Sequence, residues 1–440
     1  MTLTITMPQT RPDALPRDVL LAKFPKWTLA HWCITVAAAS FLILALLPEG
    51  RLNDLDVPTG GENVRVARSL ASRGVFADPF SSMPTGTTAH VAPVYPFLYA
   101  LFLRSFGTGY TALLLLWACN VGSLAAQMGL LPLLSHRLHF GILPGVVAAL
   151  LGTFSLYAPI DTRWEAFLTG LLLLLACLTS ELSFNRGSRG ATYAAGALWG
   201  ISILTNPVLV LLMLAWPLCW ILAQQKHHRA ASVRRSAIIV AIALLVISPW
   251  IARNYARFGA FIFVRDNLGL EFYTGNNPCA APSIRENIQS GCHFHTHPNP
   301  NAAVAKQLAN GEVAFNRAKL REALTWITTD RSAFMSLTMR RFRLFWLPDV
   351  DRAGEAILVW LVTLLSLPGL WAIARKNLVA AKLIAAAWLL FPLIYYAIQF
   401  EPRYRFPIYW TSLLPAGYAL VEIWHRLPIL HSSPPRSPAS

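Results

Sequence analysis

Long apolar runs recur along most of the chain and are separated by short polar stretches. Each run has the length and composition of a membrane-spanning helix, for which about twenty residues are needed. The stretch 191–223 is too long for one helix and is broken by Asn206-Pro207, so we divide it into two short spans. We therefore expect about ten transmembrane helices, in the range of about nine to eleven. The predicted runs are 28–48, 109–133, 141–159, 165–183, 191–223, 236–251, 355–374, 379–399 and 406–424.

The segment from Val94 to Phe106 is apolar but too short to cross a bilayer, so it should lie at the interface or re-enter. Basic residues supply an independent check, because cytoplasmic loops are rich in Lys and Arg. If this segment does not span, then Arg137, the cluster at 226–235 and the pair Arg375-Lys376 all fall on the side of the N-terminal tail. That arrangement predicts a cytoplasmic N-terminus.

Two long polar segments then face outward, one from about residue 48 to 107 and one from about 252 to 351. The second has helical patterning over 311–327, which predicts a small folded cap. We expect a cytoplasmic tail (1–27), an N-terminal transmembrane module (28–251) that includes an extracytoplasmic loop (49–108), an extracytoplasmic loop or cap (252–353), C-terminal transmembrane helices (354–425) and a disordered cytoplasmic tail (426–440).

Composition supports a membrane location. Of 440 residues, 55% are hydrophobic and 13% are charged, which is too apolar for one soluble core. The net charge of +16 comes largely from clusters between apolar runs, so it indicates cytoplasmic loops and excludes a nucleic-acid footprint. We expect a multi-pass protein of a bacterial inner (plasma) membrane with membrane lipid as its solvent and no nucleic-acid partner.

Only two of the six cysteines, Cys279 and Cys292, lie in polar surroundings. They form a disulfide if the second outward loop faces an oxidising compartment, and stay free thiols otherwise.

Acidic residues gather at the start of the first outward loop. Asp54, Asp56 and Glu62 precede or open a short amphipathic helix, so their carboxylates should cluster at the membrane surface. The other interpretation is that they cap helices and solvate a loop.

Further charged residues fall on the outward side under the same topology. His90 could complete a metal site with an acid, and Asp161 and Glu165 could line the same cavity. Arg403 and Arg405 lie outside, where the charge rule does not favour arginine; either they bind a phosphate or they snorkel to the interface. Carboxylates that can take a proton, together with arginines that can hold a departing phosphate, indicate group transfer from a lipid-linked phosphate.

Three histidines alternate at 293, 295 and 297. On an extended strand they would share one side, but no acidic partner is nearby in the sequence, so we expect no metal site there. The sequence has no Walker loop, dinucleotide fingerprint or zincin motif, which leaves a nucleotide-driven pump or an intramembrane metalloprotease without support.

Short motifs distributed over nearly the whole chain resemble those of the family 39 glycosyltransferases, which belong to the GT-C superfamily with the protein mannosyltransferases and the aminoarabinose transferase of lipid A. They are Glu62, Val66-Ala67-Arg68, Gly74, Pro79-Phe80, Thr85-Gly86-Thr87-Thr88-Ala89-His90, Ala92-Pro93-Val94-Tyr95-Pro96, Phe106-Gly107, Pro249-Trp250, Arg253-Asn254, Phe258-Gly259, Gly275-Asn276, Gly311-Glu312 and Arg403-Tyr404-Arg405.

The resemblance implies an all-α GT-C fold, a polyprenyl-phosphate-linked sugar donor, inverting transfer and an active site in the first outward loop. It places Tyr95 among the donor-binding residues. The Asp-Glu pair of better-known members falls here on Thr59 and Gly60, so the nearest acids are Glu62 and Asp56. His90 lies where lipid A-modifying relatives carry a Glu associated with metal and donor phosphate.

We therefore expect Glu62, Asp56 or Asp54 to act as the base or to orient the acceptor, and Arg403 and Arg405 to stabilise the departing phosphate. His90, Asp161, Glu165 and Tyr95 would shape the donor pocket. A divalent metal at His90 remains open, as does the acceptor, which could be a lipid, a glycan or a protein. The alternative is a transporter or flippase without chemistry, or an inactive membrane subunit; a transporter would place charges within its helices, whereas the acids here lie in outer loops.

Overall fold

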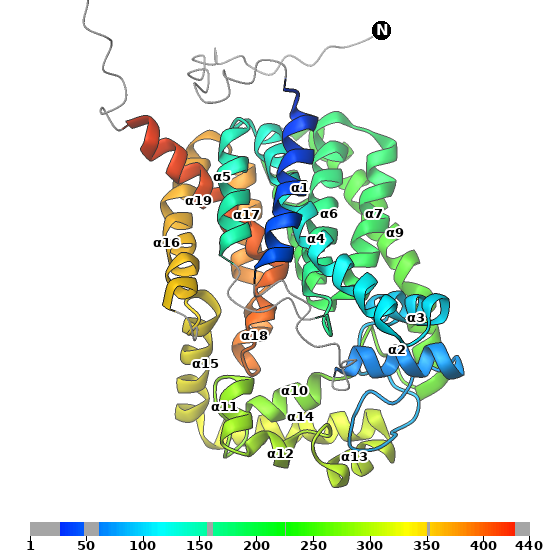
Figure 1. Cartoon of the computed structure of the whole chain (residues 1–440). Helices are drawn as coiled ribbons and strands as arrows, with labels where there is room; N and C mark the ends of the chain where they lie inside the picture. The colour runs from blue at the N-terminus through cyan, green and yellow to red at the C-terminus, as the bar shows by residue number, and fades with distance from the viewer. Residues whose placement is uncertain (1–26, 48–60, 156–161, 225, 350–352, 427–440) are drawn as a thin grey trace, which may run out of the picture.

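The structure is a computed structural model that describes residues 27–47, 61–155, 162–224, 226–349 and 353–426. These residues form helices and no named strands. One set of helices runs side by side as a bundle (Figure 1). It consists of α1 (Leu29–Leu46), α4 (Tyr110–Arg137), α5 (Leu143–Phe154), α6 (Ala166–Arg186), α7 (Arg189–Thr205), η3 (Pro207–Leu209), α8 (Val210–Ala223), α9 (Lys226–Phe258), α16 (Ala353–Lys376), α17 (Leu378–Leu390), α18 (Leu393–Ala397), η4 (Pro402–Tyr404) and α19 (Phe406–Arg426).

Six helical segments among the described residues are long and apolar enough to cross a membrane. They are Leu29–Leu46, Tyr110–Arg137, Ala166–Arg186, Arg229–Phe258, Ile357–Lys376 and Leu378–Ala397. The other predicted spans form α5, α7, η3–α8 and α19, which are shorter or less apolar. The count of ten transmembrane helices therefore stays a prediction. The six long apolar helices indicate a multi-pass membrane protein.

The bundle has apolar side chains on its outer surface and small residues where its helices touch, as helices in a membrane do. Large apolar residues stay exposed on its outside, among them Leu46 at 71% and Leu245 at 70%. Small residues let helices approach closely: a Cβ added at Gly129 would lie 2.6 Å from that of Ala37, between α4 and α1. The predicted break is confirmed, because α7 ends at Thr205 and the Asn206 side chain accepts from the Val208 amide.

The remaining helices gather at one end of the bundle, which we call the loop end (Figure 1). The first residue of α1 and the last of α19 lie at the opposite end. The loop-end helices are α2 (Glu62–Arg73), α3 (Val94–Phe106), α10 (Leu268–Gly275), α11 (Ile284–Gln289), α12 (Cys292–Thr296), α13 (Ala302–Ala309), α14 (Glu312–Thr329) and α15 (Arg331–Trp346). The predicted short helix at 94–106 and the helical pattern at 311–327 are both confirmed, as α3 and α14.

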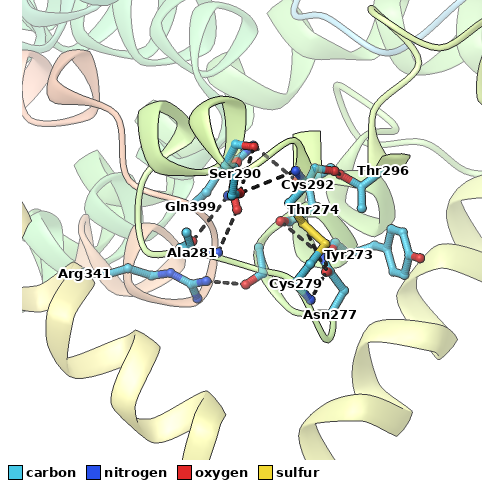
Figure 2. Close-up of a disulfide and its surroundings, with 12 residues drawn as sticks. Tyr273, Thr274, Asn277, Cys279, Ala281, Ser290, Cys292, Thr296, Arg341 and Gln399 are labelled. Carbon is cyan, nitrogen blue, oxygen red and sulfur yellow. Dashed lines mark hydrogen bonds between the residues drawn. A yellow bond between two sulfur atoms is a disulfide. The ribbon is translucent and has the colours of Figure 1, made fainter. Parts of the chain in front are cut away.

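A disulfide joins Cys279 to Cys292, as the sequence allowed, and ties the turn after α10 to the start of α12. Figure 2 shows it beside Asn277, whose side-chain oxygen accepts from the Cys279 amide at 2.9 Å. The bond closes a loop within residues 259–347, which we call the second loop.

Replacing Cys279 and Cys292 together by Ser should lower the free energy of unfolding by about 3 kcal/mol, because the bond restricts the unfolded second loop. Thermal unfolding in detergent measures this. The single change Cys33→Ser, in α1, serves as the control because Cys33 is a free thiol. An unchanged midpoint in the double variant would contradict the prediction.

Arg341 fixes the second loop to the bundle. Its side chain is fully buried in α15 and donates to the carbonyl oxygens of Gly275 and Ala397, the latter at 3.2 Å. It also donates to the side-chain oxygen of Asn276 at 3.2 Å. Since a buried guanidinium needs its hydrogen bonds, α10 and the end of α18 are held together. The residues that follow α18 carry Arg403.

Candidate active site

Glu62 is the first residue of α2, at the loop end. Only 7% of it is exposed, because the apolar face of α2, including Val66 and Ala67, packs into the protein. Gly61 precedes it and lies so close to Arg163 that an added Cβ would be 2.7 Å from the Arg163 Cβ. The start of α2 therefore has one fixed position, which places the carboxylate.

Two imidazoles lie on either side of this carboxylate. The Nε2 of His90 is 3.7 Å from one carboxylate oxygen of Glu62, and the Nε2 of His297 is 3.6 Å from the other. Both histidines are buried, and the Phe80 ring packs edge-on against both. The ring of His293 stacks on that of His297, with centroids 4.6 Å apart. His293 and His297 thus meet Glu62 and His90 across more than two hundred residues of sequence.

The prediction for the histidine triplet was wrong in its geometry. Residues 292–296 form the short helix α12, not an extended strand, and His297 directly follows it. The acidic partner that the local sequence lacks is Glu62, which precedes His297 by more than two hundred residues.

Charge is distributed unequally in this cluster. Burial tends to raise the pKa of Glu62, but the nearby His90, His297 and Arg403 lower it to about 2. Burial alone would lower the pKa of His90, yet Glu62 raises it. Burial lowers the pKa of His297 to about 3. The arrangement is an ionised Glu62 beside a neutral His297, with the pKa of His90 raised by the adjacent carboxylate.

Glu271, on α10, is a second acid whose charge interacts with Glu62, His90 and Arg403. Burial first, and then the negative charge of Glu62, raise its pKa. Asn267 donates to its carboxylate at 3.2 Å. Sequence reasoning missed this residue, whose one signal was being the single acid in the apolar stretch 267–276.

Arg403 supplies the positive charge. Its guanidinium lies 3.4 Å from the centroid of the Trp164 ring and 5.2 Å from that of Tyr404. Burial would lower its pKa, but Tyr404, Glu401 and Glu165 raise it, so it stays charged. The side chain is partly exposed, and its charge acts on both Glu62 and Glu271.

Arg405 lies in a different environment from Arg403, inside the helix bundle. It is fully buried and donates to the Trp346 carbonyl and the Thr363 hydroxyl, each at 2.8 Å. These bonds tie α19 to α15 and α16. A phosphate could reach it only if these bonds were exchanged.

The predicted residues Glu165 and Tyr95 both hold the loop before α6. Asn63, next to Glu62, donates to the Glu165 carboxylate at 2.8 Å. The Tyr95 hydroxyl is buried and donates to the Thr162 carbonyl at 2.7 Å, and Asn120 donates to that hydroxyl. The predicted residues Asp54, Asp56 and Asp161 lie outside the described part of the chain.

The described side chains around Glu62 do not form a metal centre. Within the described ranges, no group of three or more His, Cys, Asp or Glu side chains is arranged to hold an ion. The ring nitrogens of His90 are buried without a hydrogen-bond partner, but the described residues place no set of three or more metal-binding side chains around them.

No protein-family model matches this sequence, and no curated protein matches it. Solved structures do match its fold. One is the archaeal oligosaccharyltransferase AglB from Archaeoglobus fulgidus in complex with an inhibitory peptide and a dolichol-phosphate, with a TM-score of 0.55 and 13% identity over 91% of this chain and 51% of that one. The oligosaccharyltransferase of the same organism, tethered with an acceptor peptide, gives 0.55 and 13% over 90% and 50%. Its apo form gives 0.54 and 13% over 91% and 51%.

This chain thus spans about half the length of the structures it matches. The matched protein is a member of the GT-C superfamily, and the shared fold is the all-α arrangement predicted from the sequence. The narrower resemblance to family 39 and to mannosyltransferases stays a prediction.

Proposed function

We propose that this protein is an inverting glycosyltransferase that moves a sugar from a polyprenyl-phosphate-linked donor to an acceptor at the extracytoplasmic face of a bacterial inner membrane. The observation that carries the proposal is the buried, ionised Glu62, which opens a helix at the loop end and shares its surroundings with His90, Glu271 and Arg403. Perturbed carboxylates beside a fixed cation are typical of catalytic sites. The fold that this chain shares with an oligosaccharyltransferase supports the same reaction class by analogy.

The roles follow from the charges. The acceptor hydroxyl loses its proton to a carboxylate while its oxygen forms a bond to the anomeric carbon of the sugar. The bond between that carbon and the donor phosphate oxygen breaks, and the phosphate leaves with the electron pair. Arg403 is the cation that balances the charge gained by the phosphate. We assign Arg405 to the bundle and not to the phosphate, because its nitrogens already bind carbonyl and hydroxyl oxygens.

Two carboxylates with pKa values shifted in opposite directions suggest a division of labour. Glu62, with its lowered pKa, is a weak proton acceptor, and it suits the orientation of the acceptor hydroxyl and of His90. Glu271, with its raised pKa, is the better proton acceptor. The sequence led us to expect Glu62, Asp56 or Asp54 to act as the base or to orient the acceptor; we propose instead that Glu62 orients the acceptor and Glu271 takes the proton.

The test is transfer of labelled sugar from a panel of polyprenyl-phosphate sugars by the full-length protein in detergent, with membrane extract as acceptor. We expect label in the acceptor, released polyprenyl phosphate and inversion at the anomeric carbon. A purified protein that transfers nothing from any donor, but moves labelled lipid across vesicles, would replace the enzyme by the flippase.

A further inference from the structure

The backbone around His90 is held by residues from elsewhere in the chain. Arg253, at the end of α9, donates to the Thr88 carbonyl at 2.8 Å. The Asp266 amide donates to the Ala89 carbonyl at 2.8 Å, and Arg265 donates to the His90 carbonyl at 3.1 Å. All three carbonyls of 88–90 are therefore bound, and two of the three donors come from the second loop.

Glu312 binds the other side of the same tripeptide. It is the first residue of α14 and only 6% of it is exposed. One carboxylate oxygen accepts from the Thr88 hydroxyl at 2.6 Å, and the other accepts from the Ala89 amide at 2.7 Å. The Thr88 hydroxyl oxygen in turn accepts from the His90 amide at 2.9 Å. One buried side chain thus fixes the two residues that precede His90.

We propose that Glu312 is a positioning residue: by holding Thr88 and Ala89 it sets the place of His90 against Glu62, and so couples the second loop to the active site. The proposal rests on the proposed function for its effect on catalysis, but the clamp itself is a property of the fold. Glu312 touches neither Glu62 nor the reacting atoms. It acts through the backbone of His90, whose ring nitrogens have no hydrogen-bond partner among the described residues.

The charge on Glu312 makes the clamp dependent on pH. The groups that act on this carboxyl are Thr88, His90, Ala89, Asp266 and Arg253. Burial, the largest effect, and the negative charge of Asp266 raise the pKa of Glu312 to about 7, against the opposing effects of Thr88, His90 and Ala89. Above that pH the carboxylate accepts from both donors. Below it the added proton occupies one oxygen, so one of the two bonds weakens.

The clamp can be tested without any enzymatic readout, by hydrogen exchange of the peptide 85–93 in the full-length protein. Glu312→Ala should raise exchange at the Ala89 amide at least about tenfold, since that amide loses its acceptor. Glu312→Gln should protect it, because the amide oxygen can accept from Ala89 while its NH₂ faces Thr88. Glu322→Gln is the matched control, an exposed acid on the same helix paired with Lys319. Parent-like exchange in Glu312→Ala would overturn the clamp.

Transfer kinetics test the coupling. In Glu312→Ala, kcat should fall about tenfold with the donor KM unchanged, because His90 is misplaced while the phosphate site is intact. We expect kcat of the parent to show a step near pH 7, rising as Glu312 loses its proton. Glu312→Gln should regain most of kcat but lack this step, and Asp266→Asn should move the step to lower pH. Equal loss in the Ala and Gln variants with the step retained would overturn the positioning role. If the parent transfers nothing, the proposed function fails while the exchange result still decides the clamp.

Discussion

Replacing Glu62 by Gln is expected to lower kcat for sugar transfer by about 10²- to 10³-fold, with a smaller change in the donor KM. The substitution keeps the shape of the side chain but removes the negative charge that faces His90 and His297. His90 then loses the partner that raises its pKa, and the acceptor hydroxyl loses a group that orients it. Initial rates at saturating donor measure the effect. A variant with parental kcat would remove Glu62 from the mechanism.

The companion change Glu271→Gln separates the two acids. If Glu271 takes the proton, kcat should fall about 10²-fold or more, and the acidic limb of the pH–rate profile should disappear. In Glu62→Gln that limb should remain and shift to lower pH, because the charge of Glu62 is one of the effects that raise the pKa of Glu271. Glu286→Gln serves as the control, since that acid is on α11 and pairs with Arg340. A limb that disappears in Glu62→Gln and persists in Glu271→Gln would reverse the two roles.

Local signals in the sequence predicted the parts of this fold that depend on local chemistry. Asn206-Pro207 breaks a helix because proline cannot continue one, and the structure ends α7 there. Val94–Phe106 was too short to span, and α3 lies at the loop end with the same bounds. Glu62 was a natural first-turn residue beyond an apolar run, and it does open α2.

The site was harder to predict because its members meet only through tertiary structure. His297 had no acid nearby in the sequence, and its partner Glu62 becomes visible only once α12 is placed against α2. Glu271 gave no motif at all. Arg403 and Arg405 were equivalent in the sequence, since both follow the same apolar run. They separate because η4 ends at Tyr404 and α19 starts at Phe406, so that Arg405 enters the bundle while Arg403 stays partly exposed.

Arg403→Ala should weaken recognition of the lipid phosphate, raising the donor KM about tenfold and lowering kcat about 10²-fold, because the leaving phosphate loses its nearby cation. Arg403→Lys should recover part of kcat, since the charge returns without the planar group that lies against Trp164. Inhibition by free polyprenyl phosphate gives a second readout that needs no acceptor, and it should weaken in parallel. Arg405→Lys is the contrasting variant: it should lower the thermal midpoint, because bonds to Trp346 and Thr363 are lost, with little effect on that inhibition. The opposite pattern, with inhibition weakened only in Arg405→Lys, would transfer the phosphate site to Arg405 and require α19 to open toward the loop end.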